Sequence, residues 1–163
     1  MTILASTRFN DYTWNENVVY RKRHKINGIY PVLQRISHNI NPDELLFIVE
    51  MNNSQNKIEG IGLIRNKIDA DNYYKVYDFH NFNRYTYKTD YRIDRFELET
   101  YNKKLVEVFD YILFREKTHL KRGCGITCIP EKLLRHNKCD GLDLLNEVKN
   151  IFISHFGVDS KTL

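Results

Sequence analysis

Chain-breaking residues and long apolar runs are scarce in this 163-residue chain. It has 3 prolines and 7 glycines, and no window approaches the ~18 apolar residues of a membrane span. The first residues lack the basic start and long apolar stretch of a secretory signal, and we find no internal repeat or low-complexity linker. The sequence therefore predicts an intracellular protein with no membrane partner.

Cysteine is also sparse, with only three residues, at positions 124, 128 and 139. An odd number of clustered cysteines does not form the disulfide framework of a small secreted domain, so reduced thiols are expected. Together with His136 they offer the ligand types of zinc. However, a strand over 124–129 would separate the Cα atoms of Cys124 and Cys128 by roughly 13 Å. We predict buried or half-buried thiols, with no metal and no cofactor.

A complete catalytic motif is missing as well. Cys124 lies near Lys121, Arg122 and His119, and neighbouring cations lower a thiol pKa, but no base with an orienting partner is identifiable. The carboxylates of Asp90, Asp94, Glu97 and Glu99 lie among Arg and Lys residues, where ion pairing is expected. We predict that the protein is not an enzyme.

What the chain does contain describes a single globular domain over 1–163. Hydrophobic residues make up 42% and charged residues 28%, which is typical of a folded domain. Eleven tyrosines and nine phenylalanines favour strands and supply flat rings for stacking. The net charge of +4 permits a nucleic-acid partner without requiring one.

The most informative segment is a predicted hairpin. Two apolar stretches, 45–51 and 57–65, flank the polar turn 52–56. The second stretch carries Gly60 and Gly62, which would allow another backbone, a helix or a flat ligand to approach closely. This combination favours a binding module over an enzyme.

Other elements follow from periodicity. Residues 1–17 are predicted to be an extended lead-in or first strand followed by a short helix, which Gly28 and Pro31 end. Tyrosines alternate over 85–91, which predicts a strand with an aromatic face and a bulge or end near 92–95. Helical spacing of apolar residues predicts helices over about 100–115 and 140–155, the latter ending at Gly157.

Two basic runs are candidate phosphate contacts, although a solvated face is the simpler interpretation of each. The first contains Arg21, Lys22, Arg23, His24 and Lys25, and the second contains Lys117, His119, Lys121 and Arg122. The segment 121–125 includes two glycines and would serve as an anion-binding loop. Trp14, the only tryptophan, lies near the start of the chain with Tyr12, and it is either a core residue or one wall of a base pocket.

The order of these features resembles the PUA-like superfamily, particularly EVE-type domains, which are similar in fold to YTH readers. The resemblance rests on the opening stretch 7–14, the basic run before Ile29 and Tyr30, the strand 41–49 and the glycine-containing strand 58–64. The chain departs from that pattern in a helical insertion at about 99–122. The resemblance implies a curved or barrel-like sheet that binds RNA or modified bases, with Trp14 and Tyr30 near a base pocket and Lys22 and Arg23 near the backbone.

We therefore predict an α+β fold with a curved, mostly antiparallel sheet or partial β-barrel, flanked by two or three helices including one at the C-terminus. The predicted function is binding of DNA or RNA, with recognition of a modified base implied by the resemblance. Phosphate contacts are assigned to Arg21, Lys22, Arg23, Lys121 and Arg122, and the base pocket to Trp14, Tyr12 and Tyr30. The alternative is a structural or assembly protein, such as a minor component of a viral particle. The high content of Asn, Ile, Lys and Tyr suits an AT-rich coding sequence and a viral source.

Overall fold

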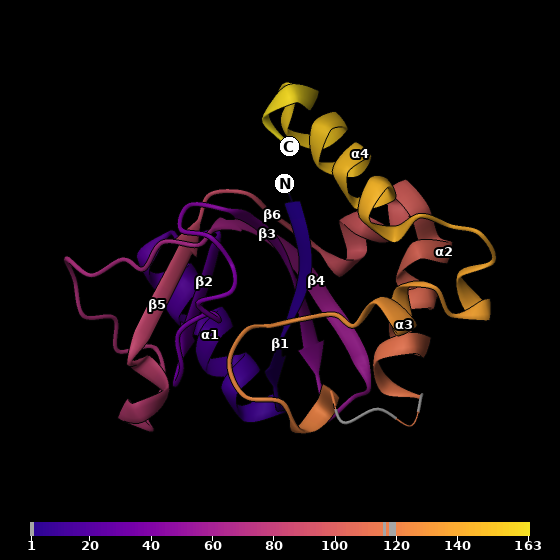
Figure 1. Ribbon diagram of the computed structural model, residues 1–163. Helices are drawn as coiled ribbons and strands as arrows, with labels where there is room; N and C mark the ends of the chain where they lie inside the picture. The colour runs from indigo at the N-terminus through magenta and orange to yellow at the C-terminus, as the bar shows by residue number, and fades with distance from the viewer. Residues whose placement is uncertain (1, 116, 118–119) are drawn as a thin grey trace.

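The computed structural model describes residues 2–115, 117 and 120–163, and it shows an α+β fold (Figure 1). The strands are β1 (Thr2–Phe9), β2 (Gly28–Val32), β3 (Leu45–Asn52), β4 (Lys57–Arg65), β5 (Tyr85–Thr89), β6 (Arg92–Asp94) and β7 (Thr127–Cys128). The described residues form four α-helices, α1 (Asp11–His24), α2 (Arg95–Phe114), α3 (Glu131–Leu134) and α4 (Leu144–Phe156). Short 3-10 helices are η1 (His80–Asn83), η2 (Leu120–Arg122), η3 (Asn137–Cys139) and η4 (Ser160–Thr162). Two or three helices were expected to flank the sheet, and the described residues form four, counting the single turn α3. A helical segment that opens at Pro130 was also expected, and α3 begins directly after this residue.

Five strands form one mixed, open sheet in the order β6-β4-β3-β1-β7. Strand β1 runs parallel to β3, and the other pairings in this sheet are antiparallel. Strands β2 and β5 form a separate antiparallel pair. The predominance of antiparallel pairing agrees with the prediction, and β6 and β7 are the two edges of the open sheet.

The predicted hairpin is confirmed. Strands β3 and β4 pair from Leu45 opposite Arg65 to Asn52 opposite Lys57, with a register shift between Glu50 and Met51. Such a bulge lets one side chain change direction without breaking the strand. The shift therefore lies directly beside Glu50, a carboxylate with 1% exposure.

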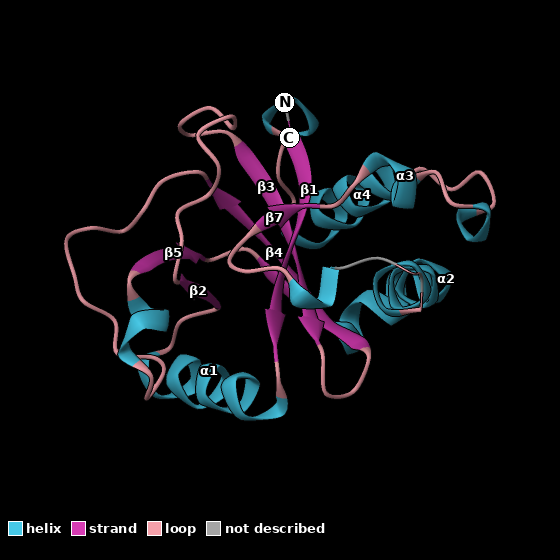
Figure 2. Cartoon of the chain, turned by 60° about the horizontal axis from the view of Figure 1, so that its bottom comes forward, coloured by secondary structure: helices cyan, strands magenta, loops and turns pink. Residues whose placement is uncertain are grey.

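Both faces of the sheet are covered, which explains why β3 is apolar almost throughout (Figure 2). On one face, Phe47, Val49 and Met51 pack in a core shared with α2, α3 and α4. On the other face, Leu46 and Ile48 pack in a core shared with β2 and β5. A strand buried on both sides loses the alternation of apolar and polar residues that marks a half-exposed strand.

The first strand ends earlier than expected. Residues 10–17 were predicted to continue an extended lead-in, but β1 ends at Phe9 and α1 begins at Asp11. The reason is a capping box at Asn10, whose side chain accepts a hydrogen bond from Thr13 N while Thr13 Oγ1 accepts one from Asn10 N. Lys25 ends the helix in the left-handed region, close to the predicted end.

The later helices lie near their predicted positions. Helix α2 begins at Arg95, capped by Asp94, a few residues before the expected start. It packs against β4 and supplies a large part of one core, including Leu105, Phe109 and Ile112. Gly157, at φ +65°, ends α4 as expected. No helix within the described residues is long and apolar enough to cross a membrane.

The aromatic strand stops slightly before the expected position. Strand β5 ends at Thr89 and pairs with β2, whereas β6 starts at Arg92 and pairs with β4 of the larger sheet. The chain therefore changes sheets across 90–91. This change brings Arg92 to the sheet edge beside Gly60 and Gly62.

Candidate functional site

A pocket of about 390 Å³ lies where β1 ends and α1 begins. Its walls come from five segments that are far apart in the chain: the end of β1, β2, the turn after β3, the loop 66–84 and the loop before β7. The residues that line it are Thr7, Arg8, Phe9, Asn10, Thr13, Tyr30, Pro31, Val32, Leu33, Asn53, Tyr77, Phe82, Lys121, Gly123, Cys124 and Gly125. We call this the β1–α1 pocket.

Arg8 is the central cation of the β1–α1 pocket. Its guanidinium donates to Thr127 Oγ1 at 2.6 and 3.0 Å, to the carbonyl of Gly125 at 3.2 Å and to Ser6 Oγ at 3.3 Å. All of these acceptors are neutral, and within the described residues Arg8 forms no ion pair with a carboxylate. Burial lowers the pKa of Arg8, an effect opposed by the nearby Cys124. The positive charge of Arg8 is therefore held in place but only weakly compensated.

Two buried polar atoms in this pocket have no hydrogen-bond partner among the described residues. They are Arg8 Nε and Asn53 Oδ1, a donor and an acceptor. Buried polar atoms are nearly always paired, because desolvation without a partner is costly. Both atoms belong to residues that line the β1–α1 pocket.

The segment 121–125, predicted to be an anion-binding loop, forms part of the wall. Gly123 lies flat over the Arg8 guanidinium, since a Cβ at this position would stand 2.6 Å from Arg8 Cζ. Its backbone N–H already donates to Leu120 O at 3.1 Å, so Gly123 provides space for Arg8 rather than a free amide. Lys121 is among the lining residues, and its ammonium group donates to Asn56 Oδ1, in the turn after β3, at 2.6 Å. His119 of the same predicted run lies outside the described residues.

The remaining wall of the β1–α1 pocket is apolar and aromatic. Phe9, Val32 and Tyr77 are buried, and Phe82 is 39% exposed at the mouth. A pocket that combines apolar walls with a few polar groups, in the range of about 300–1,000 Å³, has the usual properties of a small-molecule site. The residues that line this one include both cationic and aromatic side chains.

The five predicted phosphate contacts form two groups at the two ends of α1. Lys121 and Arg122 are near its start, because the turn 53–56 contacts both Lys121 and the backbone N–H of Asp11. Arg21, Lys22 and Arg23 are in its last turn. A 14-residue helix spans about 20 Å, so the two runs do not form one compact patch.

The C-terminal group surrounds a separate hollow. Arg21, Lys22 and Lys25 line it together with Arg92 and His155, while Asp94 and Glu97 add negative charge. Arg21 donates to Asn17 Oδ1 at 2.8 Å, and burial lowers its pKa, with a smaller contribution from Arg92. Lys22 and Arg23 are exposed. This hollow is lined by both basic and acidic residues, whereas the charged residues that line the β1–α1 pocket are basic.

The three predicted base-pocket residues have different positions. Trp14 packs edge-on against Phe9, with the guanidinium groups of Arg21 and Arg92 over its ring at 5.3 and 5.6 Å. Tyr30 lines the β1–α1 pocket but is only 2% exposed. Tyr12 is 63% exposed and donates to Asp78 Oδ2 at 2.7 Å. The three rings therefore do not enclose a common space.

Gly60 and Gly62 make room for a group from the chain itself. Arg92 donates to both carboxylate oxygens of Glu50, at 2.8 and 2.7 Å, and Tyr30 donates to Glu50 Oε1 at 2.8 Å. A Cβ at Gly60 would stand 2.7 Å from Arg92 Nη2. A Cβ at Gly62 would meet the Tyr30 hydroxyl. The expected close approach is therefore that of a buried ion pair and a tyrosine ring.

The cysteines and carboxylates that the sequence singles out have the following surroundings in the part of the chain that the structure describes. All three cysteines are free, with Cys124 and Cys128 exposed and Cys139 buried. No group of three or more His, Cys, Asp or Glu side chains among these residues is arranged to hold a metal ion. Glu99 pairs with Arg95 at 2.8 Å, as expected, and Asp94 caps α2.

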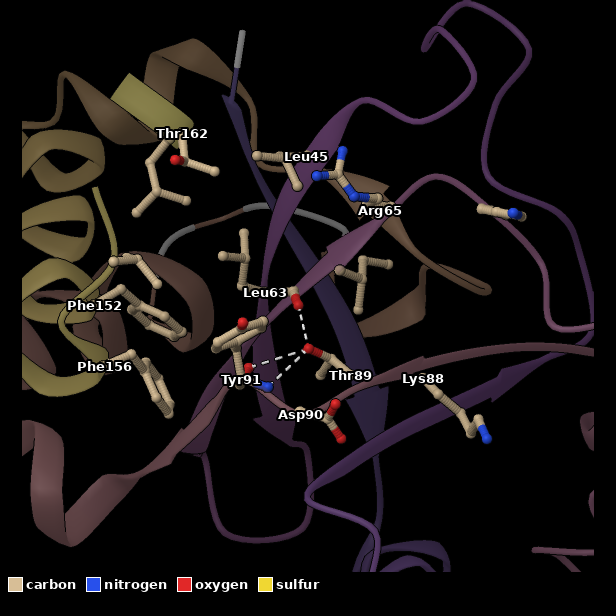
Figure 3. Close-up of a pocket in the computed structure, with 14 residues that line it drawn as sticks. Leu45, Leu63, Arg65, Lys88, Thr89, Asp90, Tyr91, Phe152, Phe156 and Thr162 are labelled. Atoms are coloured by element: carbon tan, nitrogen blue, oxygen red, sulfur yellow. Dashed lines mark hydrogen bonds between the residues drawn. The ribbon is translucent and has the colours of Figure 1, made fainter. Parts of the chain in front are cut away.

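A third, more apolar hollow of about 370 Å³ lies at the opposite end of β3, beside α4 (Figure 3). Tyr91, Phe152 and Phe156 gather on one side, with Tyr91 and Phe156 edge-to-face at 5.1 Å. The Thr89 hydroxyl donates to the carbonyl of Leu63 and thereby fixes the strand edge. The predicted site residues do not line this hollow, so it is separate from the candidate site.

Sequence reasoning missed Arg8, Asn53, Tyr77 and Phe82. A signal for Arg8 was present, because it is the one charged residue in the stretch 2–9 and it lies two residues before the capping residue Asn10. No local signal marks the others, since they reach the pocket from a turn and a long loop. The comparisons with known proteins add nothing to this geometry: no family model matches the chain, and neither the curated proteins nor the solved structures gave a significant match.

Proposed function

We propose that this protein is a nucleic-acid-binding module that holds one nucleotide in the β1–α1 pocket. The observation that carries the proposal is the arrangement of Arg8, which is held by neutral partners, without a carboxylate among the described residues, inside a pocket with an aromatic wall. A guanidinium in this state favours an anion, and planar, bidentate contacts suit phosphate oxygens. Lys121 is a second cationic residue that lines the pocket.

The rest of the pocket suits the base of such a nucleotide. Phe9, Tyr77 and Phe82 supply ring surface, and Asn53 contributes an amide side chain to the lining. Single bases taken out of a stack are typically held by aromatic contacts and by hydrogen bonds to their edges. The proposal includes recognition of a modified base in DNA or RNA, as in PUA-like proteins, whose sheet forms a partial barrel. A modified base would contact the same residues of the β1–α1 pocket.

The proposal places the protein inside a cell, and a virus-encoded origin suits the composition. The three free cysteines fit a reducing compartment. Binding is proposed in place of catalysis, because the described part of the pocket pairs its one thiol, Cys124, with cations and no identifiable base.

A structural or assembly role is the second candidate, and one observation favours it. Phe96 is 77% exposed and Tyr101 is 43% exposed, both on α2. Exposed aromatic residues of this kind are common in protein interfaces. This surface belongs to α2, on the face of the sheet opposite to that covered by α1.

The proposed function is tested by fluorescence anisotropy with labelled 12-nucleotide DNA and RNA strands at two salt concentrations. Salt-dependent binding is expected, and Lys121→Ala and Arg122→Ala should each weaken it and lower the salt slope by about 0.7–0.9. Lys103→Ala, an exposed cation on α2, is the matched control and should change neither value. Absence of binding at low salt, or an equal effect of Lys103→Ala, would contradict the proposal.

A further inference from the structure

Three aromatic side chains are exposed beside the β1–α1 pocket. Phe79 is 54% exposed, Phe82 39% and Tyr12 63%. The rings of Phe79 and Phe82 are 4.7 Å apart in an edge-to-face arrangement, and Phe82 also lines the pocket. We call Tyr12, Phe79 and Phe82 the aromatic shelf.

Two rings of the aromatic shelf, Phe79 and Phe82, belong to the long loop 66–84, which side-chain hydrogen bonds hold in place. The buried Asn83 side chain accepts hydrogen bonds from Val76 N and Tyr77 N and donates one to Tyr77 O. These are the bonds of a small folded unit, so the exposed rings do not result from a frayed segment. Contiguous exposed apolar groups that the fold holds in place mark an interaction surface.

Further bonds tie the same loop to α1. Asn17 donates to the Tyr77 hydroxyl at 3.1 Å, and Asp78 N donates to Glu16 Oε2 at 2.7 Å. Tyr12 donates to the Asp78 carboxylate. The shelf and the start of α1, where the pocket lies, therefore form one rigid surface.

The charged residues near the β1–α1 pocket and those near the aromatic shelf differ in sign. Arg8 and Lys121 are on the pocket side, whereas Glu16 and Asp78 are beside the shelf. The carboxylates would repel a phosphate, but they do not oppose contact between an aromatic ring and the face of a base. A strand would therefore run its backbone along Lys121 and present bases to Phe79 and Phe82.

We infer that the aromatic shelf is a second base-binding subsite, which stacks the base next to the pocket nucleotide and makes the protein select single-stranded nucleic acid. The inference rests on the proposed function. Bases in a duplex are covered on both faces by their neighbours, so only a strand with separable bases can contact pocket and shelf together. Stacking on aromatic side chains tolerates any base, so this subsite would add affinity without sequence preference.

The test measures anisotropy with a 12-nucleotide oligothymidine and with a 12-base-pair duplex, using the wild-type protein, Phe79→Ala and Phe96→Ala. Loss of one stacked base should weaken single-strand binding by about 5- to 100-fold in Phe79→Ala. Duplex binding and the salt slope should stay unchanged in this variant, because Phe79 contacts no phosphate. Phe96→Ala, which removes a still more exposed ring on α2, should bind like the wild type, and Phe79→Trp should retain affinity.

The outcomes separate this inference from the proposed function. If Lys121→Ala weakens binding but Phe79→Ala does not, the shelf subsite is wrong and the phosphate-binding pocket stands. If duplex and single strand bind equally well, the inference is overturned as well. If Phe79→Ala instead removes self-association in size-exclusion chromatography, the shelf is a protein contact. If the wild type binds no oligonucleotide at low salt, both proposals fall.

Discussion

Gly62 lies directly beneath the hydroxyl of Tyr30, so close that a Cβ at this position would collide with the hydroxyl and stand 2.9 Å from Tyr30 Cζ. Tyr30 is 2% exposed, and its hydroxyl donates to the buried carboxylate of Glu50. Because Gly62 of β4 has no side chain, it leaves room for the ring of Tyr30 in β2. This contact connects the two sheets and holds one wall of the β1–α1 pocket.

Gly62→Ala should destabilise the fold by about 1–3 kcal/mol, because the added methyl group meets a buried ring that cannot move without losing its bond to Glu50. Urea denaturation followed by the fluorescence of Trp14, the only tryptophan, measures this loss. The double variant Gly62→Ala with Tyr30→Phe supplies the control. Because Phe lacks the colliding oxygen, the double variant should lose less stability than the sum of the two single variants. Strict additivity would contradict the contact.

The ion pair of Arg92 and Glu50 should be far more important to stability than the exposed pair of Arg135 and Glu131. The side chains of Arg92 and Glu50 are 10% and 2% exposed, against 79% and 66% for the second pair. Arg92→Met leaves the Glu50 carboxylate buried without its counter-ion, so a loss of about 3–5 kcal/mol is expected. Arg135→Met should change the free energy of unfolding by less than about 1 kcal/mol.

A second substitution tests whether the buried, unpaired charge of Glu50 causes the loss of stability in Arg92→Met. Adding Glu50→Gln to Arg92→Met removes the uncompensated charge and still leaves an acceptor for the Tyr30 hydroxyl. The double variant should therefore be more stable than Arg92→Met alone, by at least about 1 kcal/mol. If both variants unfold at the same urea concentration, loss of packing and not buried charge explains the effect.

The sequence was sufficient to predict those helices and strands whose boundaries are set by neighbouring residues in the chain. The hairpin of β3 and β4 was predictable because two apolar stretches flank a polar turn, and the end of α4 because Gly157 follows an apolar stripe. The start of α1 was missed because the cap depends on a reciprocal pair, Asn10 with Thr13, within a polar stretch that also suits an extended chain. The change of sheet across 90–91 has no local signature either.

The candidate site was predictable only in part, since its residues are brought together by the fold. Lys121 was identified from its basic run, and it does line the β1–α1 pocket with Tyr30. Phe79 and Phe82 belong to a long loop without a regular period, and the hydrogen bonds that hold this loop come from Asn83 and from residues of α1. Gly60 and Gly62 correctly indicated a close approach, but the partner, a side chain from another strand, is a long-range feature.

Stability should fall at alkaline pH because of two buried tyrosines. Burial raises the pKa of Tyr77, and burial followed by the nearby Glu50 raises the pKa of Tyr30. In the unfolded chain both ionise near pH 10, whereas in the folded protein both keep their protons to higher pH. The unfolded state therefore binds fewer protons above pH 10, and the free energy of unfolding falls by up to about 1.4 kcal/mol per pH unit for each tyrosine.

Urea midpoints at pH 8, 9.5, 10.5 and 11 measure this dependence. The contribution should be fully present below pH 10 and should be lost as the pH rises above that value. Tyr77→Phe removes one titrating group, so it should flatten the decline even though losing the bond from Asn17 lowers stability at pH 8. Tyr73→Phe, at a 67% exposed position, should leave the slope unchanged. A wild-type slope that Tyr77→Phe does not reduce would assign the decline to other groups.

The thiols offer a direct footprint of the β1–α1 pocket. Cys124 lines the pocket and is exposed, Cys128 is exposed elsewhere with its pKa raised by partial burial, and Cys139 is buried. Because the thiolate is the reactive form, iodoacetamide at pH 7.5 should modify Cys124 faster than Cys128, and Cys139 only after unfolding. A bound 12-nucleotide strand should slow the modification of Cys124 several-fold and leave Cys128 unaffected, as read by peptide mass spectrometry. Equal protection of both thiols would indicate a general loss of reactivity, and protection of Cys128 alone would place the strand on another face of the protein.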